Sequence, residues 1–400
     1  MFGVLVIEGF IISLKTKMKQ NKFLMKTTKL ISGLAVACIG MVLSFTSCEP
    51  NEQVEPQKDL LPARFRVEIP NSISNINGFN SGRASGRIKE DTLQGNDIYL
   101  HLNTFIAVGD GAAQIAEEII NGIRKYKIDR VQSLTFTSDD DGRIKNLVVL
   151  SDVAFEGASW DYELTVTDAQ SETQTDGGKA LQVFWNRSQL VKGIAIIKPF
   201  NTDRIENADS KDAVFRIDYT EGGSLSYDAY MEVTISGLTL DNPLNDPFSV
   251  STLKMFAGKK GDVVDVFGNT NHPNAKFFTG NVGFNWAFVA SGNDATDIGV
   301  AEVGLPPSAL DNGQRDVLLK EFSIKNVFTN EIETVWPGID QNLLNSYLAN
   351  TEAPGYFGGK SGFISAGVSP GVNWDVLANR IKVLAPYNPK TISQLVVTFK

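Results

Sequence analysis

The stretch VFRIDYTEGGSLSYDAYMEVTI, residues 214–235, decides the fold of this chain. Its two ends, residues 214–219 and 229–235, are rich in β-branched and aromatic residues and flank a Glu-Gly-Gly-Ser turn at 221–224. In the second end four apolar residues alternate with Tyr230, Glu232 and Thr234. Because successive strand side chains point to opposite faces, this pattern predicts two antiparallel strands with one buried and one wet face.

Segments of the same kind recur along the chain, and glycine, asparagine and aspartate turns separate them. Helical spacing is confined to a few stretches; the clearest, 112–126, follows a Gly-Asp-Gly break in which Asp110 is placed to cap the helix. The sequence therefore predicts a mainly β fold with a few helices, in two antiparallel-sheet domains that are sandwich- or barrel-like. The other predicted strands are 63–69, 98–108, 131–137, 144–150, 160–166, 181–185, 191–197, 253–257, 262–267, 283–290 and 394–399, and the other helices are 340–349 and 374–383.

The polar stretch 199–212 is the predicted boundary between the two domains. More residues follow Cys48 than one hydrophobic core usually serves, so two domains are expected. We assign residues 64–200 to a β-rich domain with one helix and residues 201–400 to a second β-rich domain. Residues 71–86 and the glycine-rich stretch 355–361 are expected to form loops.

The N-terminus has the composition of an export signal. Lysines are frequent in 15–29, residues 30–45 are uncharged, and Ser47 precedes Cys48. A basic segment, a short apolar segment and a small residue describe a secretory signal, and the apolar run is shorter than the about 20 residues of a membrane span. Met18 and Met25 are better placed starts than Met1, so residues 1–17 are read as a misassigned start.

Residues 18–48 resemble the signal peptide of bacterial lipoproteins, with Cys48 in the lipobox position. The resemblance implies that residues 1–47 are removed, that Cys48 carries the lipid, and that the protein is held in the outer membrane by it. It leaves open whether the protein faces the periplasm or the cell surface, and an uncleaved anchor helix is the alternative. Residues 48–63, with several prolines and glutamates, then form a flexible tether.

Charge and cysteine usage exclude several classes of function. Removing residues 1–47 takes away six lysines and one glutamate, which moves the net charge from −9 to −14. Such a surface repels phosphate backbones, so nucleic acid is not an expected partner. The only other cysteine, Cys38, lies in the signal, so no disulfide, thiolate nucleophile or cysteine-bound zinc is available after Cys48.

No catalytic constellation emerges from the residues, and we predict no catalytic residues and no enzyme activity. The two histidines, His101 and His272, fall in different predicted domains, and no Gly-x-Ser-x-Gly motif is present. We also predict no cofactor and no metal site. Calcium is the alternative at the acidic turn 139–142 and at Asp294 and Asp297, although both stretches fit ordinary turns better.

The region 267–297 interleaves aromatic residues with asparagine, threonine and aspartate, a composition that suits sugar rings. The predicted ligand-binding residues are Asn271, His272, Phe278, Asn285 and Trp286. Alternation of Phe284, Trp286 and Phe288 fits a buried core equally well. We therefore expect a lipid-anchored envelope protein with a binding or structural role and a glycan or envelope protein as partner. The alternatives are a carboxylate-dependent glycan hydrolase and an assembly subunit with 394–399 as an exposed edge strand.

Overall fold

The computed structural model describes residues 64–75, 95–125, 131–138, 140–186, 191–240, 249–276, 282–359 and 361–400. The predicted signal peptide and the whole of the tether, Cys48 included, lie outside these ranges, as does Phe278. Among the described residues, no helix is both long enough and apolar enough to span a membrane.

The predicted mainly β fold with a few helices is confirmed. Thirteen strands are hydrogen-bonded in chain order, and every pairing with a described register is antiparallel. They form one sheet rather than two, and because β1 and β13 lie at opposite ends of the strand order, the sheet is open and the barrel alternative is wrong. The strands are β1 (Gln132–Thr137), β2 (Ile144–Phe155), β3 (Ala158–Asp168), β4 (Lys179–Asn186), β5 (Lys192–Ile197), β6 (Val214–Glu221), β7 (Ala229–Ser236), β8 (Thr252–Lys260), β9 (Val263–Lys276), β10 (Val282–Asn293), β11 (Ile298–Gly304), β12 (Gly355–Gly358) and β13 (Gly362–Ala366).

The helices are short except for one. The predicted helices near 340–349 and 374–383 are confirmed as α8 and α9, and the carboxylate of Asp340 caps α8 by accepting from the amides of Asn342 and Leu343. The helical elements are α3 (Asn71–Ser74), α5 (Gly95–Lys125), η1 (Ala169–Ser171), α6 (Pro199–Thr202), the π-helical turn η2 (Val317–Glu321), α7 (Ile324–Val335), α8 (Gln341–Tyr347), α9 (Val372–Ile381) and α10 (Pro389–Ser393).

The prediction of a strand at 98–108 followed by a glycine break is wrong, because α5 continues through both. Apolar residues of this stretch are buried at helical spacing, Ile98, Leu102, Phe105 and Ile106 among them. Gly109 faces Met255, and a Cβ at this position would lie 2.5 Å from the Met255 Cε atom. The glycine lies against the flexible end of the Met255 side chain of β8 and does not end the helix. Asp110 lies within α5 and is not its cap.

The folded chain divides into two compact units. Unit 1 contains Glu68–Gly109 and Leu240–Leu395, and unit 2 contains Asp110–Thr239 and Val396–Lys400, together with residues 64–67. The predicted boundary at 199–212 lies between β5 and β6, which pair with each other from Lys192 opposite Thr220 to Ile197 opposite Phe215. The division falls after β7, between Thr239 and Leu240, and not within the polar stretch 199–212.

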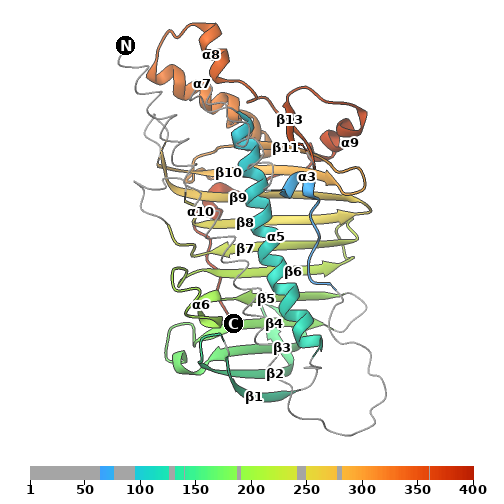
Figure 1. The fold of residues 1–400 in the computed structure, drawn as a ribbon, viewed down its shortest axis with the longest axis vertical. Helices are drawn as coiled ribbons and strands as arrows, with labels where there is room; N and C mark the ends of the chain where they lie inside the picture. The colour runs from blue at the N-terminus through green and yellow to red at the C-terminus, as the bar shows by residue number, and fades with distance from the viewer. Residues whose placement is uncertain are drawn as a thin grey trace. The chain divides into compact units, whose positions relative to one another are not determined.

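Unit 2 contains strands β1 to β7, which lie side by side in chain order (Figure 1). One face of its sheet is covered by the start of the described chain. The ring of Phe65 lies 5.6 Å from that of Tyr219, and a Cβ added to Gly193 would lie 2.4 Å from Phe65. Residues 63–69 were predicted as a strand; Phe65, Val67 and Ile69 are indeed buried, but no strand forms. The amide of Phe65 donates to Glu117 Oε1 and that of Val67 to Met231 Sδ. These backbone amides are therefore bonded to side chains and not to the backbone of a neighbouring strand.

The opposite face of unit 2 is covered by residues 396–400. The predicted strand at 394–399 does not form, so the exposed edge on which the assembly alternative depended is absent from the described chain. Instead the amide of Val397 donates to Ser236 Oγ, and Lys400 Nζ lies 2.5 Å from Glu163 Oε2. The apolar residues of this face form one buried cluster: Trp160, Phe184, Ile194, Ile196, Val214 and Val397.

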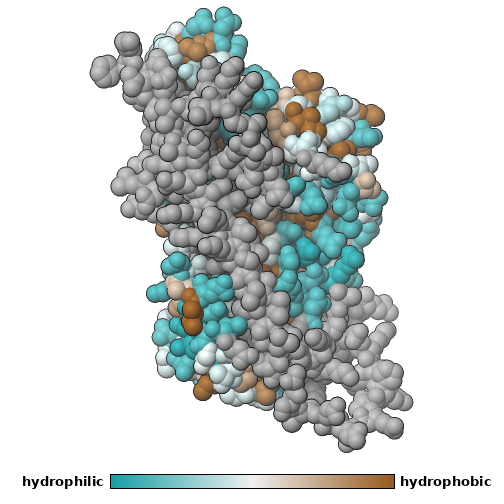
Figure 2. Space-filling model, in the orientation of Figure 1, coloured by the Kyte–Doolittle hydropathy of each residue, from teal (hydrophilic) through white to brown (hydrophobic). Residues whose placement is uncertain are grey.

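Unit 1 contains strands β8 to β13 and most of the helices. The stretch 355–361, predicted as a loop, contributes β12, which pairs with β11 and with β13. Helix α9 packs its inner side on the sheet through Leu377 and Ile381. On its outer side Val372 is 73% and Val376 58% exposed, and Figure 2 shows hydrophobic residues gathered on the surface around β13 and α9.

Candidate functional site

Four of the five residues predicted to bind a ligand lie on β9 and β10, and Phe278 lies outside the described residues. Asn285 is directly opposite Asn271 in the antiparallel register, whereas His272 and Trp286 occupy the alternate positions beside them. Because side chains of a strand alternate between faces, His272 and Trp286 share one face and the two asparagines share the other. The structure thus brings the four residues onto neighbouring strands and divides them between two faces.

His272 and Trp286 belong to an aromatic cluster beneath α5. The ring of Phe105 lies 5.4 Å from that of His272 and 5.3 Å from that of Trp286, and His101 lies 5.9 Å from Trp286. The cluster joins both histidines of the chain, which the sequence assigned to different domains. His272 is 1% and Trp286 5% exposed, so neither offers a ring face to solvent. These side chains pack as a core, and their role in ligand binding stays a prediction.

The asparagines form a buried chain of amides on the other face. Asn269 Nδ2 donates to Asn285 Oδ1, Asn285 Nδ2 donates to Asn271 Oδ1, and Asn271 Nδ2 donates to Ser251 Oγ. Ser308 Oγ also donates to Asn271 Oδ1 at 2.6 Å. A buried polar network with its members paired fixes one arrangement of the surrounding backbone. The network therefore holds the segments before β8 and after β11 to the sheet.

We expect Asn285→Leu to lower the free energy of unfolding by about 2 kcal/mol, because it leaves the buried Asn269 amide without its acceptor and removes a donor to Asn271. Urea denaturation followed by fluorescence measures the loss. The exposed Asn373 on α9 provides the matched control, since Asn373→Leu should change stability by less than about 0.5 kcal/mol. Equal losses in the two variants would contradict a structural role of the amide chain.

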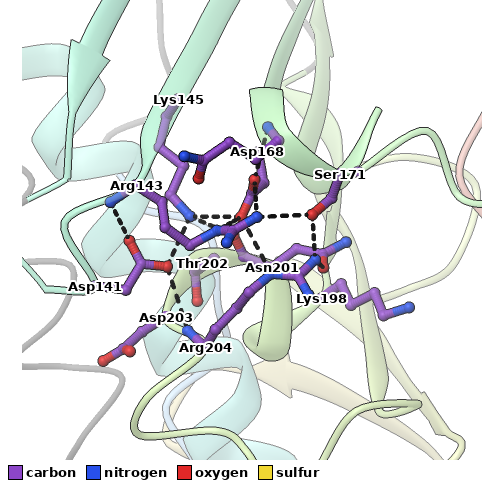
Figure 3. A network of polar contacts seen from close by, with 12 residues as sticks. Asp141, Arg143, Lys145, Asp168, Ser171, Lys198, Asn201, Thr202, Asp203 and Arg204 are labelled. Atoms are coloured by element: carbon purple, nitrogen blue, oxygen red, sulfur yellow. Dashed lines mark hydrogen bonds and ion pairs between the residues drawn. The ribbon is translucent and has the colours of Figure 1, made fainter. Parts of the chain in front are cut away.

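A second polar site, which the sequence analysis did not predict, lies in unit 2 around Lys145 (Figure 3). Lys145 is on β2, in phase with Leu147 and Val149, and its side chain is fully buried like theirs. A lysine on the buried face of an alternating strand is the sequence signal that would have identified the site. The turn before β2, the end of β3 and α6 supply the other members.

Lys145 Nζ donates to three oxygen atoms. They are Asp141 Oδ2 at 3.0 Å, Asp168 Oδ2 at 3.3 Å and the carbonyl oxygen of Asn201 at 2.9 Å. A lysine ammonium group has three donors, so each of them is used. A buried charge without partners is costly, and these contacts compensate the burial of Lys145.

Asp168 is the acceptor on which the site converges. Arg143 donates to its carboxylate through Nε at 2.6 Å and Nη2 at 2.8 Å, and Arg204 donates through Nε at 3.2 Å. Burial alone would raise the pKa of Asp168, but the hydrogen bonds of Arg143 and the charge of Lys145 outweigh burial and hold the pKa well below its usual range. Asp168 therefore stays ionised at physiological pH and serves as an acceptor.

The two arginines of the site also meet each other. Arg143 Nη2 and Arg204 Nη2 both donate to Ser171 Oγ, at 3.0 and 2.7 Å. The arginine side chains are 27% and 24% exposed, whereas Lys145 and the two aspartates beneath them are buried. The ion pairs of the site thus join three cationic side chains to two carboxylates, and the buried Asp203 is a third carboxylate beside Arg204 (Figure 3).

The calcium alternative at the turn before β2 has a competing explanation. Asp141 accepts from Lys145 Nζ and from the backbone amides of Arg143 and Arg204, at 3.0 to 3.3 Å. Its carboxylate is therefore committed to donors of the chain, and Asp139 lies outside the described residues. Within the described ranges, no group of three or more His, Cys, Asp or Glu residues could hold a metal ion.

Comparison with known proteins finds no family model, no curated protein and no solved structure that matches this chain. The function must therefore be inferred from the residues and their geometry.

Proposed function

We propose that this chain is a lipoprotein of the bacterial outer membrane whose folded part binds a surface ligand or has a structural role, without chemical turnover. The anchor is supported by the basic and apolar segments before Cys48 and by the absence of any other cysteine downstream. Attachment by several acyl chains holds a protein stably without a spanning helix. The acidic composition after Cys48 suits an exported protein exposed to water.

The observation that carries the binding role is the arrangement of charge around Asp168. A catalytic acid or base needs a pKa close to the working pH. Here the arginine and lysine groups move the pKa of Asp168 in the opposite direction, and they fix its carboxylate between them. What the site presents outward is the pair of guanidinium groups, which suit recognition of a ligand better than its conversion.

A combined binding and turnover experiment tests the proposal. The purified chain is applied to an array of neutral and acidic polysaccharides, and the same polysaccharides are assayed in solution for new reducing ends. We expect retention on at least one polysaccharide and no new reducing ends with any of them. Release of product from any polysaccharide would contradict the non-catalytic proposal.

A glycan hydrolase is the second candidate, and one observation favours it. Asp218 on β6 lies directly opposite Glu232 on β7, and burial raises the pKa of Asp218 although Arg216 acts to lower it. A carboxyl group with a raised pKa beside a second carboxyl group is the pattern of acid-base hydrolysis. Against it, Arg216 donates to both oxygen atoms of Asp218, at 2.7 and 2.9 Å. If turnover is found, its loss in Asp218→Asn would establish this candidate.

A further inference from the structure

Arg143 and Arg204 each use one edge of the guanidinium group within the protein and leave the other edge unused. Both donate to the protein through Nε and Nη2. Neither Nη1 atom has a hydrogen-bond partner among the described residues. About a quarter of each side chain is exposed, so part of each arginine is in contact with solvent.

The position of the two arginines is fixed by contacts that do not depend on a ligand. Arg143 is held by both oxygen atoms of Asp168, and Arg204 also donates to Asn201 Oδ1 at 2.8 Å. The guanidinium carbon of Arg204 lies 4.4 Å from the centre of the Phe200 ring, over which it stacks. A guanidinium group held in this way loses little entropy when it binds a further acceptor.

The local charge is suited to an anion. Three cationic side chains share two carboxylates in the ion pairs of the site. A fourth cation, Lys211, lies 5.9 Å from the same Phe200 ring and offsets the carboxylate of Asp203. Ser171 brings the two like-charged guanidinium groups together, which is unfavourable unless a negative group compensates them. Asp168 supplies part of that compensation, because its carboxylate accepts from both arginines (Figure 3).

We propose that Arg143 and Arg204 form a binding site for an oxyanion, with the two Nη1 groups as donors. Sulfate, phosphate and carboxylate groups share the geometry that a guanidinium group matches, and hydrogen bonds between such charged groups are short and strong. The ligand of the proposed function would then be an acidic glycan that carries sulfate or uronate groups. This extension to a glycan rests on the proposed function, whereas the oxyanion site does not.

Isothermal titration of the full chain in detergent with sodium sulfate tests the site, with sodium chloride at equal ionic strength as the reference. Sulfate stabilises most proteins by exclusion from their surface, so a saturable heat with one site per chain is the required readout. We expect saturable binding in the wild type and a loss of affinity of about tenfold or more in Arg204→Gln. Arg204→Lys keeps the charge and should also bind more weakly, because the planar fork is lost.

Arg216→Gln is the matched control, because Arg216 is an arginine of the same unit that faces two carboxylates and leaves no positive charge in excess. It should bind sulfate as the wild type does. Equal sulfate affinity in Arg204→Gln and the wild type, or no saturable heat in the wild type, would overturn the oxyanion site. Titration with a sulfated polysaccharide and with a polyuronate then shows which of the two groups of an acidic glycan the site binds. Sulfate binding with retention of neutral glycans only would leave the oxyanion site and the proposed function standing and refute the acidic-glycan extension.

Discussion

Replacement of Asp168 by alanine is expected to lower the free energy of unfolding by about 3–5 kcal/mol. The variant leaves the ammonium group of Lys145 fully buried with Asp141 as its only carboxylate, and it removes the main acceptor of Arg143. A buried charge that loses one of its partners costs more than the lost attraction alone, because its hydration is not restored. Urea denaturation of the two proteins at neutral pH measures the difference.

Asp311→Ala is the control for this prediction. Asp311 also pairs with a lysine, Lys390, but both side chains are largely exposed, and such pairs contribute at most about 1 kcal/mol. A loss in Asp168→Ala no larger than that in Asp311→Ala would show that the charged site does not stabilise the fold. Asp168→Asn keeps the shape of the side chain and removes its charge. The stability of this variant separates the contribution of the charge from that of packing.

The carboxylate of Asp168 also makes the stability of the fold depend on pH, in a direction set by its lowered pKa. The pKa of Asp168 is lower in the folded chain than in the unfolded chain, where it is about 3.9. Its contribution is therefore complete above that value and is lost as the pH falls toward the folded pKa. The difference in stability between the wild type and Asp168→Ala should accordingly shrink below about pH 4. A difference that grows on acidification would contradict this assignment.

Local pattern was sufficient to predict the strands of unit 2. Alternation at 229–235 correctly placed Met231, Val233 and Ile235 on a buried face of β7. The predicted wet face is wrong at Thr234, which is 6% exposed, because residues 396–400 cover the opposite face of this sheet. The glycine turn at 222–223 and the acidic turn before β2 also lie where expected, with Gly142, Gly222 and Gly223 at positive φ. These signals depend on a few neighbouring residues, so no distant contact is needed to interpret them.

The first half of helix α5 was mispredicted because the residues that pack against it are distant in the sequence. Two glycines within three residues normally end a helix, since each costs up to about 1 kcal/mol in its interior. Gly109 packs against Met255 of β8, and nothing near residue 109 in the sequence indicates that contact. Tertiary packing therefore overrides local propensity at this position.

The candidate sites were predictable only in part. The β9 and β10 residues were identified from composition, but composition does not tell a buried aromatic cluster from an exposed one. Lys145 is recognisable from its phase in β2, whereas its partners Asp168 and Asn201 are 23 and 56 residues away. The convergence of three elements on one ammonium group depends on the strand order, which a single sequence does not give.

Replacement of Cys48 by alanine is expected to release the protein from the membrane completely. In the proposed lipoprotein signal the lipid is joined to the sulfur atom of this residue, and alanine cannot accept it. No other cysteine follows to take its place, and several acyl chains account for the whole anchoring energy in this proposal. Cys38→Ala is the matched control, because it changes the other cysteine within the signal and should leave anchoring intact.

Fractionation of cells that express the wild type and Cys48→Ala, with metabolic labelling by an alkyne fatty acid, tests the lipid anchor most directly. The anchor predicts a labelled wild type in the outer-membrane fraction and an unlabelled Cys48→Ala protein in the soluble fraction. An unlabelled wild type, or a Cys48→Ala protein that stays in the membrane, would contradict it and identify residues 30–45 as an uncleaved anchor helix.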